Sequence, residues 1–196
     1  MREGDLLPST YSYTWGDERP RMVARMRAAM TETVERLWRE RAPGLPLKTP
    51  AEAVTLASIV EKETARADER PRIAGVFLNR LRRGVKLQSD PTVIYALAQG
   101  GEFNRPLTRA DLRLPHPYNT YATDGLPPGP IANPGRAALE AVLKPIATEE
   151  LYFVADGTGG HAFARTLDEH NRNVARWRQL LRERGQPLPP AALSEE

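Results

Sequence analysis

The stretch on which the fold interpretation depends runs Leu56-Ala-Ser-Ile-Val-Glu-Lys-Glu-Thr-Ala-Arg66. It lies late in a predicted helix that begins at Thr49-Pro-Ala-Glu52. There, a threonine can cap the helix, a proline fits the first helical position, and a glutamate completes a capping box. These signals predict a helix that continues to a break near residues 67–68.

The apolar residues of this predicted helix share one face. At about 100° per residue they form a single stripe of Ala53, Leu56, Ala57 and Val60. Glu63 projects onto the stripe, whereas Glu61 falls on its edge, nearer solvent. A carboxyl group on an apolar face must be paired, hydrogen-bonded or neutralised, and a raised pKa lets it donate a proton near neutral pH. From the residues alone a structural alternative stays open, with Glu63 solvated or paired with an arginine.

The composition is that of an ordinary globular protein. The 196 residues are 40% hydrophobic and 27% charged, and no run approaches the ~18 apolar residues of a membrane span. The absence of cysteine excludes disulfides and thiolate metal sites, and the three histidines match no metal-ligand spacing, so we expect neither a metal nor a cofactor. A net charge of +3 with dispersed basic residues gives no support for nucleic-acid binding.

The remaining pattern predicts a mainly helical α+β domain over residues 1–184. Residues 1–20 are expected to be extended and packed on the body, and residues 185–196 to form a disordered tail. Further helices are expected over 21–41, 69–83, from Pro91 to 100–101, 133–143 with Asn133 as cap and Pro134 first, and 166–184 behind a capping box. Residues 85–90 are expected to be extended, and 151–155 and 161–164 to form a small β-hairpin.

Residues 101–134 are predicted to be irregular and rich in proline. Long loops of this kind are usually functional or disordered, and the apolar and aromatic residues here disfavour disorder. Because prolines stiffen a loop by lowering the entropy of its unfolded state, we interpret this segment as the wall of a cleft.

Several blocks of sequence resemble the MltG (YceG-like) endolytic murein transglycosylases. The resemblance begins at Ala57-Ser-Ile-Val-Glu-Lys-Glu-Thr64 and covers about residues 3–180. It continues in order through Phe77-Leu-Asn-Arg-Leu81, Leu87-Gln-Ser-Asp-Pro-Thr-Val93, Tyr118-Asn-Thr-Tyr121, Gly125-Leu-Pro-Pro-Gly-Pro-Ile131, Asn133-Pro-Gly135, Tyr152-Phe-Val154, Gly160-His161 and His170-Asn171. One departure is Ser9, where the family often has aspartate, so no carboxylate role is expected at that position.

The resemblance implies a lysozyme-like helical catalytic core excised from a longer protein. Members of the family have one N-terminal membrane span and a small LysM-like subdomain, so the full-length protein is expected at the periplasmic face of the inner membrane and this fragment to be soluble. The implied activity is cleavage of the MurNAc–GlcNAc bond of peptidoglycan without water, which gives 1,6-anhydro-MurNAc ends and limits the length of nascent glycan strands. Peptidoglycan synthases are the implied partners, and any membrane contact is through the missing anchor.

The family's catalytic glutamate precedes the threonine of Glu-Lys-Glu-Thr, which is Glu63 here, the residue that the helical wheel also selects. The candidate substrate-binding residues come from the matching blocks: Ser58, Gln88, Asp90, Tyr118, Asn119, Thr120, Tyr121 and His161. For both tyrosines, packing of the loop is an equal alternative to sugar stacking. Ser58 can simply back-bond its helix. Asp90 can be a helix cap, and for His161 a structural hydrogen bond is favoured.

Two other functions stay open. One is a muramidase, in which Glu63 works with Asp90 to add water. The other is an inactive peptidoglycan-binding module.

Overall fold

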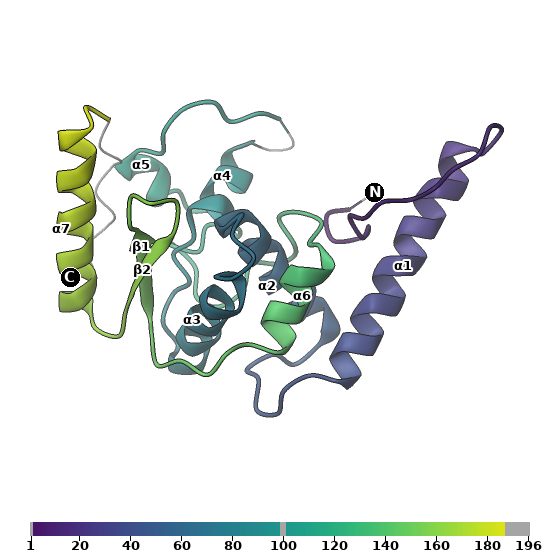
Figure 1. Ribbon diagram of the computed structural model, residues 1–196, viewed down its shortest axis with the longest axis horizontal. Helices are drawn as coiled ribbons and strands as arrows, with labels where there is room; N and C mark the ends of the chain where they lie inside the picture. Colours follow the sequence, from purple (N-terminus) through teal and green to yellow (C-terminus); the bar gives the residue numbers. More distant parts are fainter. Residues whose placement is uncertain (1, 99–100, 187–196) are drawn as a thin grey trace. The chain divides into compact units, whose positions relative to one another are not determined.

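A computed structural model describes residues 2–98 and 101–186 of the chain. Over these ranges the fold is mainly helical, with one small antiparallel sheet (Figure 1). The helices are α1 (Arg19–Arg39), α2 (Pro50–Glu63), α3 (Arg70–Arg83), α4 (Asp90–Ala98), α5 (Arg109–Leu112), α6 (Arg136–Leu143) and α7 (Leu167–Glu183), and the strands are β1 (Tyr152–Ala155) and β2 (His161–Ala164). The predicted mainly helical α+β class with a small hairpin is confirmed.

The chain divides into two compact units. The first comprises Met1–Ala74 and Pro128–Ile146, and the second comprises Gly75–Pro127 and Ala147–Glu196. The single domain over 1–184 stays a prediction, and most of the predicted tail, residues 187–196, lies outside the described residues. In the part of the chain that the structure describes, no helix combines the length and apolar character that a membrane span requires.

Helix α2 is the buried centre of the first unit. Thr49 caps the helix as predicted, accepting a hydrogen bond from the backbone of Glu52 at 3.2 Å, and Pro50 is the first helical residue. The predicted capping box is wrong, because the Glu52 carboxylate accepts from the backbone N–H of Lys48 and not from that of Thr49. Every residue from Ala53 to Val60 is buried, so the predicted one-sided stripe is too narrow. The reason is that α2 is covered on more than one side, since both α6 and α1 pack against it. A helix that is mostly apolar all round belongs in a core.

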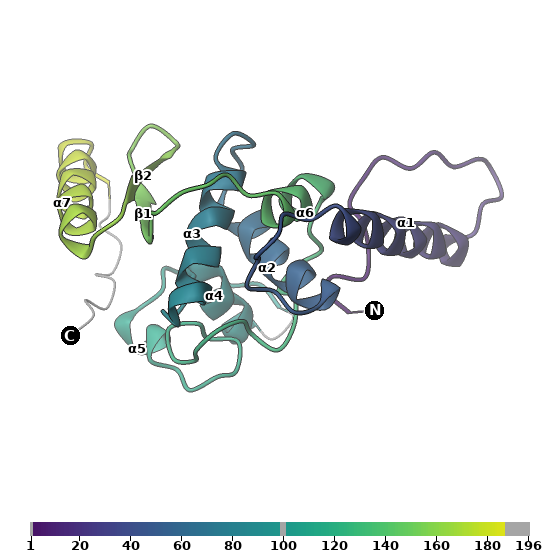
Figure 2. The same cartoon turned by 90° about the horizontal axis from the view of Figure 1, so that it is seen from below.

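The N-terminal segment is only partly packed. Leu6 and Leu7 are buried, and the backbone N–H of Leu7 bonds the carbonyl of Met26 on α1. The segment then loops outward before returning to the start of α1, with Trp15 fully exposed (Figure 2). The predicted packing of the aromatic residues of this segment is therefore wrong for Tyr13 and Trp15, which are both exposed. Asp17 holds this loop by local hydrogen bonds to Thr14, a closure that needs no burial of the aromatic rings.

The predicted entry to helix α6 is wrong by two residues. Gly135, and not Asn133, is the N-cap, and the helix begins at Arg136. The side-chain oxygen of Asn133 instead accepts a hydrogen bond from the backbone N–H of Leu6 at 3.0 Å. The side-chain oxygen of Asn133 is therefore used by Leu6, far away in the sequence, and does not cap the helix. Pro134 lies outside helix α6.

The second unit contains the hairpin and helix α7. Strands β1 and β2 are antiparallel with Phe153 opposite Phe163, as the hairpin prediction required. Asp156 closes the turn between them by accepting hydrogen bonds from the backbone of Thr158 and of Gly160. Helix α7 is capped by Thr166, as predicted, and packs against both strands. The predicted capping box does not form, because Glu169 accepts from the backbone N–H of Arg165.

Two predictions about connecting segments need correction. The loop over 101–134 contains a short helix, α5, whose capping box joins Thr108 and Asp111. Its residue Leu112 is buried with Val93 of α4, which explains why an otherwise irregular loop has a helical turn there. Residues 85–90 do not form a strand, because Gln88 has a positive φ of 51° and interrupts the extended backbone.

Candidate functional site

Glu63 is the last residue of helix α2, directly after its buried segment. The predicted continuation of the helix to residues 67–68 is wrong, because Thr64 adopts an extended backbone with φ −144° and ψ 137° and ends the helix. Glu63 is half-buried, as expected for a carboxyl carried toward the interior. The predicted contrast with Glu61 is not observed, because Glu61 is half-buried as well.

The surroundings of Glu61 are those of a structural carboxylate. Glu61 accepts a hydrogen bond from the backbone N–H of Gly135, the N-cap of α6, at 3.1 Å. A carboxylate at a helix N-terminus is stabilised by the unpaired N–H groups and by the helix dipole. Glu61 therefore has a structural task at the start of α6.

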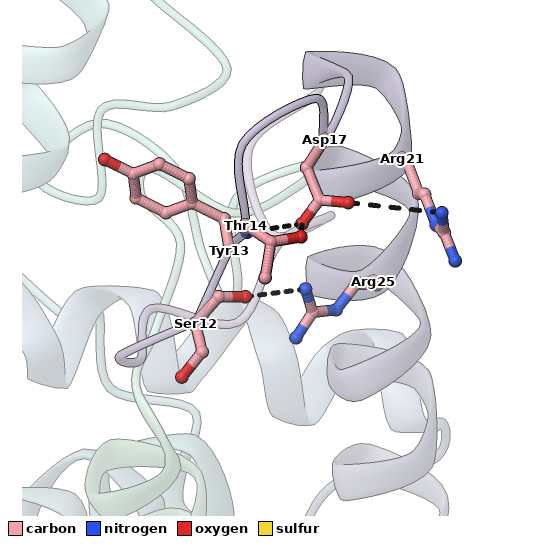
Figure 3. A pocket seen from close by; sticks show the side chains of 6 residues that line it. All are labelled: Ser12, Tyr13, Thr14, Asp17, Arg21 and Arg25. Carbon is pink, nitrogen blue, oxygen red and sulfur yellow. Dashed lines mark hydrogen bonds and ion pairs between the residues drawn. The ribbon is translucent and has the colours of Figure 1, made fainter.

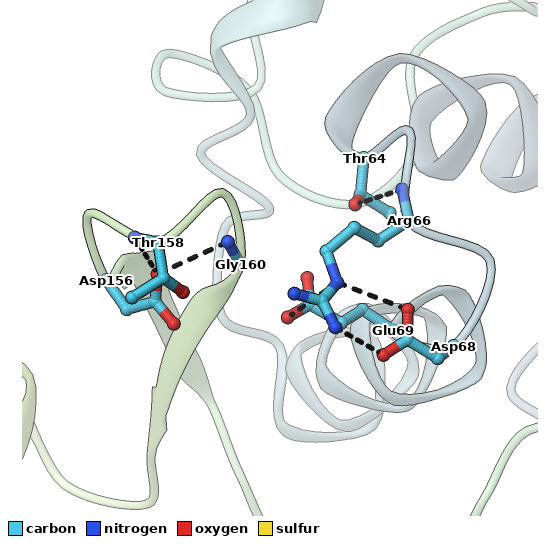
Figure 4. Close-up of polar contacts among 7 residues, drawn as sticks. All are labelled: Thr64, Arg66, Asp68, Glu69, Asp156, Thr158 and Gly160. Carbon is cyan, nitrogen blue, oxygen red and sulfur yellow. Dashed lines mark hydrogen bonds and ion pairs between the residues drawn. The ribbon is translucent and has the colours of Figure 1, made fainter.

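The turn after Glu63 is held by local polar contacts. The buried Thr64 hydroxyl accepts a hydrogen bond from the backbone N–H of Arg66 at 3.0 Å. The guanidinium of Arg66 in turn contacts both oxygens of Asp68, at 3.2 and 2.6 Å, and lies 3.8 Å from Glu69 (Figure 4). The hydrogen bond with Arg66 holds the pKa of Asp68 below its ordinary value, so this carboxylate stays ionised.

Ser58 is fully buried and serves the structure of the first unit. Its hydroxyl donates to the carbonyl of Thr55 at 2.7 Å and accepts from the backbone N–H of Ile131 at 2.9 Å. The expected back-bonding to the helix is confirmed. Substrate contact by Ser58 stays a prediction, and its observed contacts are those of a residue that fixes the 131 segment to α2.

The loop residues singled out in the second unit meet at one place. The backbone N–H of Gln88 donates to the carbonyl of Thr120 at 3.1 Å, and that of Ser89 donates to the Thr120 hydroxyl at 2.9 Å. The hydroxyls of Thr92 and Thr120 are also 2.9 Å apart. The two sequence blocks that begin at Leu87 and Tyr118 therefore form one hydrogen-bonded loop pair.

Asn119 and Thr120 are fully buried inside this loop pair. The amide nitrogen of Asn119 donates to the carbonyls of Leu112 and Leu114 at 3.0 and 2.8 Å, and its oxygen accepts from the backbone of Tyr121 at 2.9 Å. These bonds use the amide's two donors and its oxygen. Substrate contact by Asn119 and Thr120 stays a prediction. Their observed hydrogen bonds are those of side chains that hold the loop in its conformation.

Tyr121 and Asp90 form a second link across the pair. The phenol of Tyr121 donates to the carboxylate of Asp90 at 2.6 Å, and Asp90 is the exposed first residue of α4. The half-buried ring of Tyr118 lies 4.9 Å from that of Tyr95. Tyr118 and Tyr121 thus both pack and keep part of their surface accessible, which leaves both of their predicted roles open.

The remaining candidate, His161, lies on strand β2. Its ring meets Phe153 edge-on at 5.4 Å. Sequence reasoning also missed two residues that organise the loop pair, Thr92 and Arg80. Both belong to sequence blocks that match the family. The residue pattern of those blocks does not show that the buried guanidinium of Arg80 bonds Gln88, or that the buried hydroxyl of Thr92 contacts Thr120.

A separate hollow of about 400 Å³ lies in the N-terminal segment and contains none of the predicted site residues. It is lined by Ser12, Tyr13, Thr14, Asp17, Arg21 and Arg25. In it, Arg25 donates to the carbonyl of Ser12 at 2.8 Å, and Asp17 lies 4.0 Å from Arg21 (Figure 3).

These features define a mainly helical protein whose best candidate for chemistry is one carboxyl group at the end of a buried helix. The chain belongs to the YceG-like family, whose model matches residues 1–176.

The chain is similar in sequence to named bacterial proteins and to one solved structure. A Bacillus subtilis protein named endolytic murein transglycosylase is 36% identical over 170 residues, which is 87% of this chain and 46% of the relative. A Streptococcus pneumoniae R6 protein of the same name is 38% identical over 177 residues, covering 88% and 32%. The crystal structure of a yceG-like protein from Listeria monocytogenes superposes with a TM-score of 0.71 at 38% identity, covering 86% of this chain and 53% of that one. The chain thus spans about half, or less, of the length of these relatives.

Proposed function

We propose that this chain is the catalytic part of an endolytic murein transglycosylase, with Glu63 as its acid and base. The observation that carries this proposal is the position of Glu63, half-buried at the end of the buried helix α2 in a chain of the YceG-like family. Relatives at 36–38% identity are named endolytic murein transglycosylases, which supports the same chemistry here.

The reaction requires one carboxyl group in two successive roles. Protonated Glu63 donates its proton to the glycosidic oxygen as the bond between MurNAc C1 and that oxygen breaks. The carboxylate then takes the proton of the C6 hydroxyl while O6 forms a bond to C1. The product carries a 1,6-anhydro ring, no water is consumed, and Glu63 ends protonated as it began.

A second carboxylate is not needed for this route. Hydrolytic glycosidases use two, either to activate a water or to form a covalent intermediate. The positive charge that develops at C1 can instead be stabilised by neutral amides and hydroxyls or by the substrate's own acetamido group. Gln88, Tyr118 and Tyr121 are the residues we propose for contacts with the sugars, within a lysozyme-like core and a cleft walled by the 101–134 loop.

The experiment is digestion of purified murein with this chain, followed by mass spectrometry of the soluble products. The parent is expected to release fragments with anhydro ends, and Glu63→Gln to lower their rate of release by about 10²- to 10⁴-fold. Glu61→Gln is the matched control two residues away, because an amide oxygen still accepts the hydrogen bond of Gly135. Its product yield should stay close to that of the parent.

The same digestion separates the other functions. Reducing ends in place of anhydro ends would assign hydrolysis, with Asp90 as the second carboxylate to test. Equal product from Glu63→Gln and the parent would remove Glu63 from catalysis. No product from any variant, with murein still bound in a pull-down, would favour a binding module.

The wider role is a proposal that concerns the whole protein. Cutting nascent strands would limit glycan length, beside peptidoglycan synthases and at the periplasmic face of the inner membrane. These expectations belong to the longer relatives, of which this chain matches a part.

A further inference from the structure

Arg80 is a buried cation in the last turn of helix α3, with a side chain only 6% exposed. One guanidinium nitrogen donates to the carbonyl of Leu87 at 3.4 Å, and the other donates to the side-chain oxygen of Gln88 at 3.0 Å. Burial of a charge is costly unless hydrogen bonds compensate for it. Both terminal nitrogens of the guanidinium bond the turn formed by Leu87 and Gln88.

The guanidinium also lies beside an aromatic ring, that of Tyr152. Its central carbon lies 5.2 Å from the ring centroid of Tyr152, within range of a cation–π interaction. The ring of Tyr152 stacks on His170, with centroids 5.2 Å apart and planes at 25°. Burial, with a smaller contribution from nearby Arg80, lowers the pKa of His170, which favours a neutral imidazole there. Four matching blocks of the sequence thus meet at Arg80.

Gln88 has an unusual backbone. Its φ of 51° lies in the left-handed region, and no other described non-glycine residue has a positive φ. Glycine would adopt this conformation without steric cost, whereas a side chain there is strained. Strained residues of this kind gather at ligand-binding and active sites, so the carboxamide of Gln88 has a use beyond forming the turn.

Arg80 decides which way that carboxamide points. Because a guanidinium can only donate, the atom that faces it is the amide oxygen, and the NH₂ group must face the other side. Among the described residues this NH₂ group has no hydrogen-bond partner, and Gln88 is half-buried. Two oriented donors are thus left for a ligand.

We propose that Arg80 is a positioning residue, which holds the Gln88 carboxamide so that its NH₂ group donates to an oxygen of the glycan substrate. A sugar hydroxyl or an acetamido carbonyl is the chemical class of acceptor that fits two amide donors. This inference rests on the proposed function for its substrate, and on the Arg80–Gln88 contact for its mechanism.

The decisive variant is Gln88→Glu, measured as KM and kcat for release of fragments from soluble murein strands. A carboxylate still accepts from Arg80, and more strongly because the bond is charge-assisted, so the thermal midpoint should not fall. It has no donor for the substrate, so KM should rise by about 2- to 12-fold while kcat stays nearly constant. A purely structural role of Gln88 would leave KM unchanged, and that result overturns the inference.

The second test asks whether Arg80 acts through Gln88. Arg80→Lys keeps the charge and loses the two-pronged contact, so KM should rise as in Gln88→Glu, whereas Arg83→Lys on the exposed end of the same helix should match the parent. In the double variant Arg80→Lys/Gln88→Ala, KM should equal that of Gln88→Ala alone. If the two substitutions instead raised KM by the product of their separate factors, the positioning role of Arg80 would be overturned.

The two proposals can fail independently. If Glu63→Gln is active, the proposed catalytic role of Glu63 is wrong, and a raised KM for Gln88→Glu would still support contact between Gln88 and the ligand. An inactive Glu63→Gln together with a parental KM for Gln88→Glu overturns the present inference alone.

Discussion

The hydroxyl of Ser58 joins helix α2 to the backbone of Ile131, accepting its N–H at 2.9 Å across 73 residues of sequence. The same hydroxyl donates to the carbonyl of Thr55, so both of its roles as donor and acceptor are used. The last part of the proline-rich loop is therefore bonded directly to the helix that ends at Glu63.

We expect Ser58→Ala to lower the free energy of unfolding by about 1–3 kcal/mol, because the buried N–H of Ile131 loses its acceptor. Urea denaturation followed by circular dichroism measures this. Thr31→Ala is the control, since Thr31 also bonds a carbonyl of its own helix but is exposed. It should change the free energy by less than about 0.5 kcal/mol. Equal effects in the two variants would contradict the joining role of Ser58.

Gly4→Ala should destabilise the first unit more than Gly44→Ala. Both glycines have a positive φ, of 83° and 70°, so each substitution carries a backbone cost of about 1–2 kcal/mol. At Gly4 an added Cβ would also lie 2.6 Å from Pro130 and 3.0 Å from Val54, whereas at Gly44 it would meet nothing within 4 Å. The difference between the two variants in denaturation isolates this steric contact, which should add about 1–3 kcal/mol.

Asp111 should make the second unit sensitive to acid. Two hydrogen bonds from Arg105, at 2.6 and 2.8 Å, and further ones from Thr108 hold the pKa of this carboxyl well below its ordinary value. Because the folded-state pKa is depressed, the stability it provides is present above the unfolded pKa near 3.9 and is lost as pH falls through the folded value. Asp111→Asn should therefore reduce stability at pH 7 and flatten its decline below about pH 5. Parallel pH curves for the two proteins would count against this.

His170 should give a second, milder pH dependence. Burial, and then Arg80, lower the pKa of its imidazole in the folded state. The unfolded chain, with a histidine pKa near 6.5, then binds the proton more tightly, so folding weakens as pH falls from about 7 through 6.5 and on to the folded value. His170→Gln removes this component. The check is the thermal midpoint between pH 8 and 5, where the variant should show the flatter curve.

Local signals in the sequence were sufficient for most elements. Thr49 and Thr166 each cap the predicted helix, and the hairpin lies where the short apolar runs placed it. Periodicity also placed Glu63 late in a largely buried helix, although the helix ends at Glu63 and not near residues 67–68. These features depend on residues within a few positions of one another, which is the range that capping and periodicity report.

Several of the failures involve partners far apart in the chain. Asn133 bonds Leu6 instead of capping α6, and Glu61 is occupied by Gly135, so neither outcome is visible in a local window. The burial of Asn119 likewise depends on carbonyls of the α5 turn, a helix too short to give a periodic signal. The helical wheel of α2 also could not show which of its sides other helices would cover, so the predicted contrast in exposure between Glu61 and Glu63 failed.

The fastening of the N-terminal residues has a mechanical consequence. Gly4 lies against Pro130, Leu6 bonds Asn133, and between those two partners Ile131 is held by Ser58 of α2. A force that pulls on the backbone ahead of Arg2 would act first on these three contacts. Through Ser58 it would then act on helix α2, so the force could change the position of the Glu63 carboxyl. Optical-tweezer traces of chains pulled from residue 2 should show one early rupture, which Ser58→Ala shifts to lower force.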